Sequence, residues 1–93
     1  MVIEFEILYH NKVVKEDIKN LSLIWKNKIR FAIENKLTVA PDLYGKPLRR
    51  SLKGYRKLRV GDYRVVFKIN AKKVYVLAIM HRFVIYQKMK NRL

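Results

Sequence analysis

Residues 55–67 hold the side chains with the clearest chemical potential, because cations crowd a strand-like stretch there. In an extended chain alternate side chains share a face, so Leu58 points to one side and Lys57 and Arg59 to the other. Across a two-residue turn, Arg64 comes to lie beside Arg59 on that same face. Like charges on adjacent strands repel each other. Cations held together without a carboxylate therefore indicate a phosphate-binding surface; the plainer alternative is a charged face that keeps the sheet solvated.

The charge of the chain is divided unevenly between its two halves. Residues 1–43 carry 7 Lys or Arg and 6 Asp or Glu, whereas residues 44–93 carry 15 Lys or Arg and a single acid, Asp62, out of totals of 22 and 7. Self-repulsion on this scale costs stability unless a partner offsets it. We expect RNA or DNA as that partner, with an acidic protein as a second partner that can coexist. An anionic membrane surface is the weaker choice, because no segment pairs a strong apolar face with a basic one.

Missing residue types narrow the chemistry further. The chain has no Cys, which excludes disulfides, thiolate zinc sites and a cysteine nucleophile. His10 and His81 are the only imidazoles and lie far apart in the sequence. We therefore expect no metal site and no cofactor. We also expect a cytoplasmic protein, because no signal peptide opens the chain and no apolar run is long enough to span a bilayer.

The elements that must position these residues begin with a strand and two helices. Residues 2–9 alternate crudely between apolar and polar types, which predicts a strand. Asn11 and Ser22 are candidate N-caps, and apolar residues recur at helical spacing after each of them. Residues 12–37 are therefore predicted to form a helical hairpin. Residues 38–54 contain Pro and Gly at intervals that interrupt regular structure.

The second half of the chain is predicted to be mostly strand. Residues 55–60, 63–69 and 73–80 are rich in β-branched and aromatic types and are separated by short turns, which predicts a three-stranded antiparallel meander. Residues 85–93 are predicted to form a short basic helix. The order is then β-α-α-β-β-β, a single α+β domain over residues 1–93 with its helices on one face of the sheet.

Three stretches resemble one known family. They are Gly45-Lys-Pro-Leu-Arg49, Leu52-Lys-Gly-Tyr-Arg-Lys-Leu-Arg-Val-Gly-Asp-Tyr-Arg-Val-Val-Phe67 and His81-Arg-Phe-Val-Ile-Tyr86. In type and order they resemble the RelE/ParE toxin superfamily, over nearly the whole chain. The resemblance implies a RelE-like fold and a type II toxin held by an acidic antitoxin in a hetero-oligomer. It leaves two targets open, since the RelE branch cleaves messenger RNA in the ribosomal decoding site and the ParE branch inhibits DNA gyrase without the nuclease residues.

The resemblance can be carried over residue by residue. Lys57 lies where the RelE pattern has a second-strand lysine, Arg64 at the arginine of the Tyr-Arg-Val motif, and Arg82 at the C-terminal basic position. Tyr86 matches the tyrosine four residues later. The resemblance thus favours a metal-independent, ribosome-dependent endoribonuclease over a ParE-like gyrase inhibitor. Some relatives carry a His where Arg82 stands, and some carry a Glu base that has no counterpart here.

These residue types fit the cleavage of RNA by its own 2′-OH. Arg64 would clamp the non-bridging phosphate oxygens with its fork of donors. Lys57 would be the base if the neighbouring arginines favour its neutral amine, and Tyr86 would orient the 2′-OH or stack on a base. Arg82 would stabilise the leaving 5′-oxygen. Because a guanidinium is a poor proton donor, His81 is the alternative acid, with packing in the sheet as its structural alternative.

Further basic residues are expected to contact the phosphates of messenger or ribosomal RNA. Such contacts are independent of base sequence and weaken as salt rises. Ordinary solvation of a basic surface is the alternative. The expected RNA-binding residues are Arg49, Arg50, Lys53, Arg56, Arg59 and Lys88.

Overall fold

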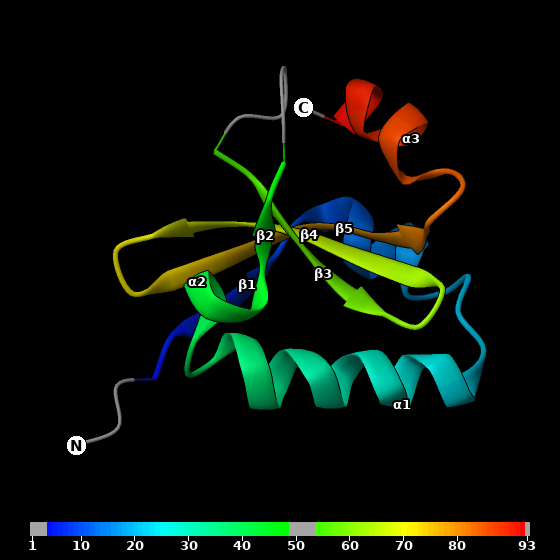
Figure 1. Cartoon of the computed structure of the whole chain (residues 1–93). Helices are drawn as coiled ribbons and strands as arrows, with labels where there is room; N and C mark the ends of the chain where they lie inside the picture. The colour runs from blue at the N-terminus through cyan, green and yellow to red at the C-terminus, as the bar shows by residue number, and fades with distance from the viewer. Residues whose placement is uncertain (1–3, 49–53, 93) are drawn as a thin grey trace.

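The computed structural model describes residues 4–48 and 54–92, which are built around a five-stranded sheet (Figure 1). In spatial order the strands are β1 (Glu6–Tyr9), β5 (Lys73–His81), β4 (Tyr63–Asn70), β3 (Arg56–Val60) and β2 (Lys46–Pro47). β1 is parallel to β5, and the other neighbouring strands are antiparallel. The predicted meander therefore forms the centre of the sheet, and the predicted N-terminal strand joins it beside β5.

Helices cover both faces of this sheet. The helical segments are η1 (Val13–Asp17), α1 (Leu23–Ala32), η2 (Ile33–Leu37), α2 (Pro41–Tyr44) and α3 (Ile85–Arg92). η2 continues α1 without a break, and this long helix lies along one face while α3 lies over the other (Figure 1). The predicted α+β class and helical hairpin are confirmed. The prediction that all helices share one face is wrong, because the C-terminal helix packs on the opposite side. No helix within the described residues combines the length and apolarity needed to cross a membrane.

Local hydrogen bonds fix where the two N-terminal helical segments begin. The Oγ atom of Ser22 accepts a hydrogen bond from the backbone N–H of Trp25 (3.4 Å), as the predicted cap requires. At the first helix the prediction of Asn11 is wrong by one residue. The Nδ1 atom of His10 accepts from the backbone N–H of Lys12 (3.0 Å), so His10 takes the capping position. His10 is thus structural, and its ring serves the start of a helix.

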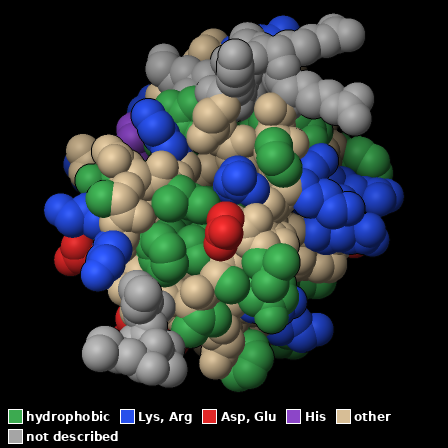
Figure 2. Space-filling view, turned by 60° about the vertical axis from the view of Figure 1, so that its left-hand side comes forward, with side chains coloured by type: hydrophobic (Ala, Val, Ile, Leu, Met, Phe, Trp, Pro, Cys, Tyr) green, Lys and Arg blue, Asp and Glu red, His purple; other side chains and the backbone are tan. Residues whose placement is uncertain are grey.

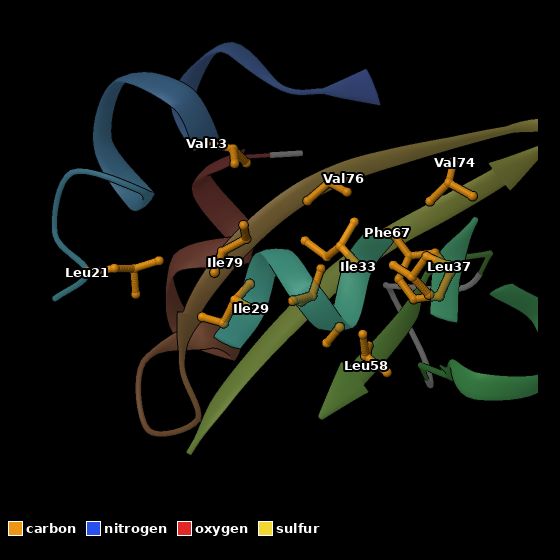
Figure 3. Close-up of a cluster of buried hydrophobic side chains, with 12 residues drawn as sticks. Val13, Leu21, Ile29, Ile33, Leu37, Leu58, Phe67, Val74, Val76 and Ile79 are labelled. Carbon is orange, nitrogen blue, oxygen red and sulfur yellow. The ribbon is translucent and has the colours of Figure 1, made fainter. Parts of the chain in front are cut away.

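The larger core lies between the sheet and the α1–η2 helix (Figure 3). Removing these apolar side chains from water is the main force that holds the layers together. The ring of Phe67 is fully buried there and requires a glycine at position 45, because an added Cβ on Gly45 would lie 2.2 Å from the ring. The main members of this core are Val13, Leu21, Ile29, Ile33, Leu37, Leu58, Val65, Phe67, Val74, Val76 and Ile79.

A smaller core lies on the opposite face, between the sheet and α3. It is formed by Leu48, Val66, Ala78, Met80, Ile85 and Met89. A β-bulge shapes it, because Val66 pairs with Ala78 while the next residue pairs with Val76, which leaves Leu77 as an extra residue. Leu77 packs against this smaller core. Simple alternation along residues 73–81 would place Leu77 on the same face as Ile79, and the bulge places it on the opposite face instead.

A buried ion pair fastens α3 to the rest of the molecule. The Asp17 carboxylate accepts hydrogen bonds from the Arg92 guanidinium (2.5 Å) and from the backbone N–H of Ile79 (2.9 Å). The two charged side chains are only 5% and 7% exposed. β1 pairs with β5 only as far as Val76. Beyond that point the Asp17 carboxylate provides the acceptor for the backbone N–H of Ile79 that a neighbouring strand would otherwise provide.

Candidate active site

Lys57 and Tyr86 are in direct contact, although 29 residues separate them in the chain. The Nζ atom of Lys57 donates a hydrogen bond to the Tyr86 hydroxyl (2.7 Å) and lies 5.5 Å from the centre of its ring. Lys57 comes from β3 and Tyr86 from the first turn of α3. Two of the residues predicted to be catalytic are thus brought together by the packing of α3 on the sheet.

Arg64 lies on the same face of the sheet. Lys57 and Arg59 flank a leucine that points into the larger core, so both side chains face the α3 side. Arg64 is the cross-strand partner of Arg59, as the sequence predicted. Its Nη1 atom donates to the carbonyl oxygens of Gly61 and Tyr63, both at 2.9 Å. This anchoring holds the guanidinium against the β3–β4 turn while most of its donors point elsewhere.

Arg82 approaches the same turn from the end of β5. Its backbone N–H donates to the carbonyl oxygen of Asp62 (2.8 Å), and its Nε atom lies 3.9 Å from the Asp62 carboxylate. Asp62 thus belongs to the turn, as predicted. The four predicted catalytic residues form two pairs: Lys57 with Tyr86, and Arg64 with Arg82 around the β3–β4 turn. Within residues 4–48 and 54–92, no hydrogen bond joins one pair to the other.

An open hollow of about 320 Å³ connects the cations of β3 and β4 with those of neighbouring elements. We call it the cationic hollow. Its lining residues include five cations and no carboxylate. Such a concentration of one sign of charge attracts phosphate. In Figure 2 the largest group of Lys and Arg side chains lies on the right of the view, and others are spread over the rest of that face. The residues that line the hollow are Lys36, Tyr44, Lys46, Lys57, Leu58, Arg59 and Arg64.

Comparison with known proteins assigns the chain to a family. Residues 7–86 match the family model described as the ParE toxin of the type II toxin–antitoxin system parDE. The chain belongs to the RelE/ParE toxin superfamily. No curated protein sequence gave a significant match.

Solved structures of toxins resemble this toxin over most of its length. The RelBE2 toxin–antitoxin complex from Mycobacterium tuberculosis contains a chain that is 26% identical, with a TM-score of 0.80 over 86% of this chain and 100% of that one. The RelB–RelE complex from Methanococcus jannaschii gives 26% identity and a TM-score of 0.66 over 85% and 94%. YafQ from Escherichia coli gives 26% identity and a TM-score of 0.65 over 89% and 99%. The RelE-like fold predicted from the sequence is therefore confirmed.

The toxin's His81 lies on the other face of the sheet from Lys57 and Tyr86. Its ring packs edge-on against Tyr63 (5.6 Å between ring centres), which itself packs against the larger core. Its Nδ1 atom accepts a hydrogen bond from the backbone N–H of Phe83 (3.3 Å). The geometry corresponds to the structural alternative for His81, since its ring packs in a row of aromatic rings and its Nδ1 atom is occupied by a backbone donor.

Arg56, predicted to bind RNA, holds two elements of the toxin together. Its Nη1 atom donates to the carbonyl oxygens of Asp42 (3.2 Å) and Gly45 (2.9 Å), which ties β3 to the end of α2. Arg59 lines the cationic hollow, and Lys88 is exposed on α3. The other predicted RNA-binding residues, Arg49, Arg50 and Lys53, lie outside the described residues.

Two lining residues of the cationic hollow were missed by sequence reasoning. Lys36 lies in η2, near the end of the segment predicted to form a helical hairpin, and its Nζ atom is 5.5 Å from the ring centre of Tyr44. Tyr44 ends α2, a helix that begins with Pro41 in a segment predicted to be irregular. Proline is compatible with the first position of a helix, so Pro41 was a signal for α2. No sequence signal placed Lys36 beside β3.

The toxin's described residues contain no group of three or more His, Asp or Glu side chains placed to hold a metal ion. The polar side chains that line or border the cationic hollow are amines, guanidinium groups and phenols.

Proposed function

We propose that this toxin is an endoribonuclease that cuts messenger RNA on the ribosome by attack of the RNA's own 2′-oxygen. The contact between Lys57 and Tyr86, at the border of the cationic hollow, is the observation that carries the proposal. A lysine amine and a phenol at 2.7 Å form a unit that can both hold a 2′-OH and take its proton. The guanidinium of Arg64 adds the positive charge that a phosphorane needs.

The reaction is a transfer within the RNA. The 2′-oxygen forms a bond to phosphorus, its proton passes to the amine of Lys57, which acts as the base, and the bond from phosphorus to the 5′-oxygen breaks. The leaving 5′-oxygen gains a proton from solvent while Arg82 stabilises its charge. The products are a 2′,3′-cyclic phosphate and a 5′-hydroxyl. Most of the rate enhancement comes from positioning and charge stabilisation.

An acidic antitoxin is the proposed protein partner. The similar chains from M. tuberculosis and M. jannaschii were both solved in toxin–antitoxin complexes. The formal net charge of +15 favours an acidic partner. The outer side of α1 also exposes three large apolar side chains that a partner can cover, namely Leu23, Ile24 and Phe31.

A gyrase inhibitor is the second candidate, and the ParE description of the matching family model favours it. Such a toxin would bind its target without chemistry. It would leave messages intact while causing double-strand breaks and loss of DNA supercoiling. The two candidates therefore differ in which nucleic acid is broken after induction.

The test is induced expression of the toxin with primer-extension mapping of cellular messages. We expect growth arrest with new 5′ ends inside coding regions. The double variant Arg64→Ala with Tyr86→Phe is expected to abolish both effects while its circular dichroism stays that of the native toxin. Arg30→Ala with Tyr9→Phe is the matched control, since it changes the same residue types outside the cationic hollow. Unchanged toxicity in the first variant, or intact messages during growth arrest, would refute the nuclease.

A further inference from the structure

Phe83 is an exposed aromatic residue that the proposed chemistry does not use. It lies in the turn between β5 and α3, and 74% of its surface is exposed to solvent. Single exposed apolar residues are common and need no explanation by themselves. Phe83 differs because its ring packs against Arg82 and against His81, which belongs to a row of aromatic rings behind it.

The contacts of Phe83 describe that position. Its backbone N–H donates to the Nδ1 atom of His81, and the two ring centres lie 4.9 Å apart with 36° between the planes. The His81 ring contacts Tyr63 (5.6 Å), and Tyr63 contacts Trp25 (5.0 Å). Four rings thus form a row from the larger core to the surface, and Phe83 is its exposed end.

Positive charge surrounds this exposed end. The Cζ atom of Arg82 lies 4.7 Å from the centre of the Phe83 ring. Arg82 also contacts the β3–β4 turn, to which Arg64 is anchored, so the guanidinium assigned to the leaving oxygen lies directly beside the platform. Phe83 precedes Tyr86 by three residues, which places their Cα atoms within about 10 Å of each other.

We infer that Phe83 is a stacking platform for one base of the RNA, next to the phosphodiester that Lys57 and Tyr86 act on. The position relative to the cut rests on the proposed function; the stacking itself does not. Single-stranded RNA is bound by exposed aromatic rings beside cations, since each base offers a flat face and each nucleotide a phosphate. An apolar protein segment fits this place less well, because the charged Arg82 lies against the Phe83 ring, whereas α1 presents several exposed apolar residues together.

Binding of a nuclease-resistant RNA tests the platform separately from cleavage. The probe is a 2′-O-methylated single-stranded oligoribonucleotide with a fluorescent end, and its anisotropy reports the affinity for the purified toxin. We expect Phe83→Ala to weaken binding about 5-fold to 100-fold, the range known for loss of one stacked base. Phe83→Trp is expected to keep the native affinity. Phe31→Ala is the matched control, because Phe31 is similarly exposed (69%) but lies on α1, and it should stay within about 2-fold of native.

Two further readouts separate stacking from other roles. Because Phe83 contacts no phosphate, Phe83→Ala should weaken binding equally at low and high salt and leave the salt dependence unchanged. In a set of probes, each oligoribonucleotide carries a single abasic sugar at a different position. One of these positions should lower the affinity of the native toxin and leave the affinity of the Phe83→Ala variant unchanged. Native affinity in Phe83→Ala, or an equal further loss with every abasic probe, would overturn the platform.

The outcome also distinguishes this inference from the proposed nuclease. If the native toxin cuts no message but the binding results are as expected, the nuclease fails and the platform stands. If the native toxin cuts RNA while Phe83→Ala binds the probe like the native toxin, the platform fails and the nuclease stands.

Discussion

The two faces of the sheet differ in how completely helices cover them. On one face the continuous α1–η2 helix seals a core in which Val65, Phe67 and Val76 are fully buried. On the other face α3 has only eight residues and packs mainly over β5. Beside it, Lys57 and Arg64 are half-buried and Arg59 is exposed. The short helix thus leaves room for chemistry, whereas the long helix provides the stability on which the site depends.

Two of the acidic residues that contact an arginine, Asp17 and Asp62, show the same contrast. Asp17 and Arg92 are 5% and 7% exposed and share their contact with the backbone of β5. Asp62 and Arg82 are 63% and 45% exposed. Burial makes the first pair a structural joint, while water screens the second and leaves Arg82 available for a ligand.

The largest effect on stability is expected in the face that α1 seals. Phe67→Ala removes a fully buried ring and leaves a cavity that rigid neighbours cannot fill, so the free energy of unfolding should fall by about 3–5 kcal/mol. Urea denaturation followed by circular dichroism measures the loss. A loss below about 1 kcal/mol would show that this face is not the main core.

The next effect should come from the joint that holds α3. Asp17→Asn leaves the Arg92 guanidinium buried without its counter-charge, and we expect a loss of about 3 kcal/mol in the free energy of unfolding. Asp62→Asn is the matched control, with an expected loss of less than about 1 kcal/mol because that pair is exposed. Equal losses in the two variants would contradict the contrast drawn between the pairs.

A smaller effect is expected at the turn that both arginines contact. Gly61 has a φ of +59°, and an added Cβ would lie 2.4 Å from the Trp25 ring. We expect Gly61→Ala to cost about 1–3 kcal/mol and to change the Trp25 fluorescence, because the ring must move. Gly54→Ala meets no atom within 4 Å, so it shows the cost of a positive φ alone. Equal losses in the free energy of unfolding for the two variants would show that the close approach of Trp25 to Gly61 does not contribute to the cost.

The smallest effect on stability is expected at the candidate active site. Lys57 forms an exposed hydrogen bond with Tyr86, so Lys57→Met should change the free energy of unfolding by no more than about 0.5 kcal/mol. Differential scanning calorimetry of the variant and the native toxin measures this. A loss comparable to that of Asp17→Asn would assign Lys57 to the joint with α3 and not to chemistry.

The sequence predicted the strands of the meander well, because alternation and turn residues are local signals. It also placed Arg59 beside Arg64, since a two-residue turn fixes the register between β3 and β4. Lys57 and Tyr86 were assigned to one site by resemblance to a family, and the structure shows them in contact.

What the sequence could not predict depends on contacts between distant elements. The bulge at Val66 reverses the side on which Leu77 lies, and no local pattern marks it. The Asp17–Arg92 pair joins residues that are 75 positions apart in the chain. Because this pair helps to hold α3 in place, the sheet face on which α3 packs could not be predicted either. Lys36 joins the cationic hollow only because α1 continues into η2 and carries it to the edge of β3.

The most direct measurement is cleavage of a message on translating ribosomes by purified toxin, with chemical analysis of the new ends. We expect fragments that end in a 2′,3′-cyclic phosphate and begin with a 5′-hydroxyl. We also expect Lys57→Met and Tyr86→Phe each to lower the rate by about 100-fold or more, because each removes a group that takes part in proton transfer. Messages that stay intact with the native toxin, or variants that cut as fast as it does, would contradict the claim that this face of the sheet performs chemistry.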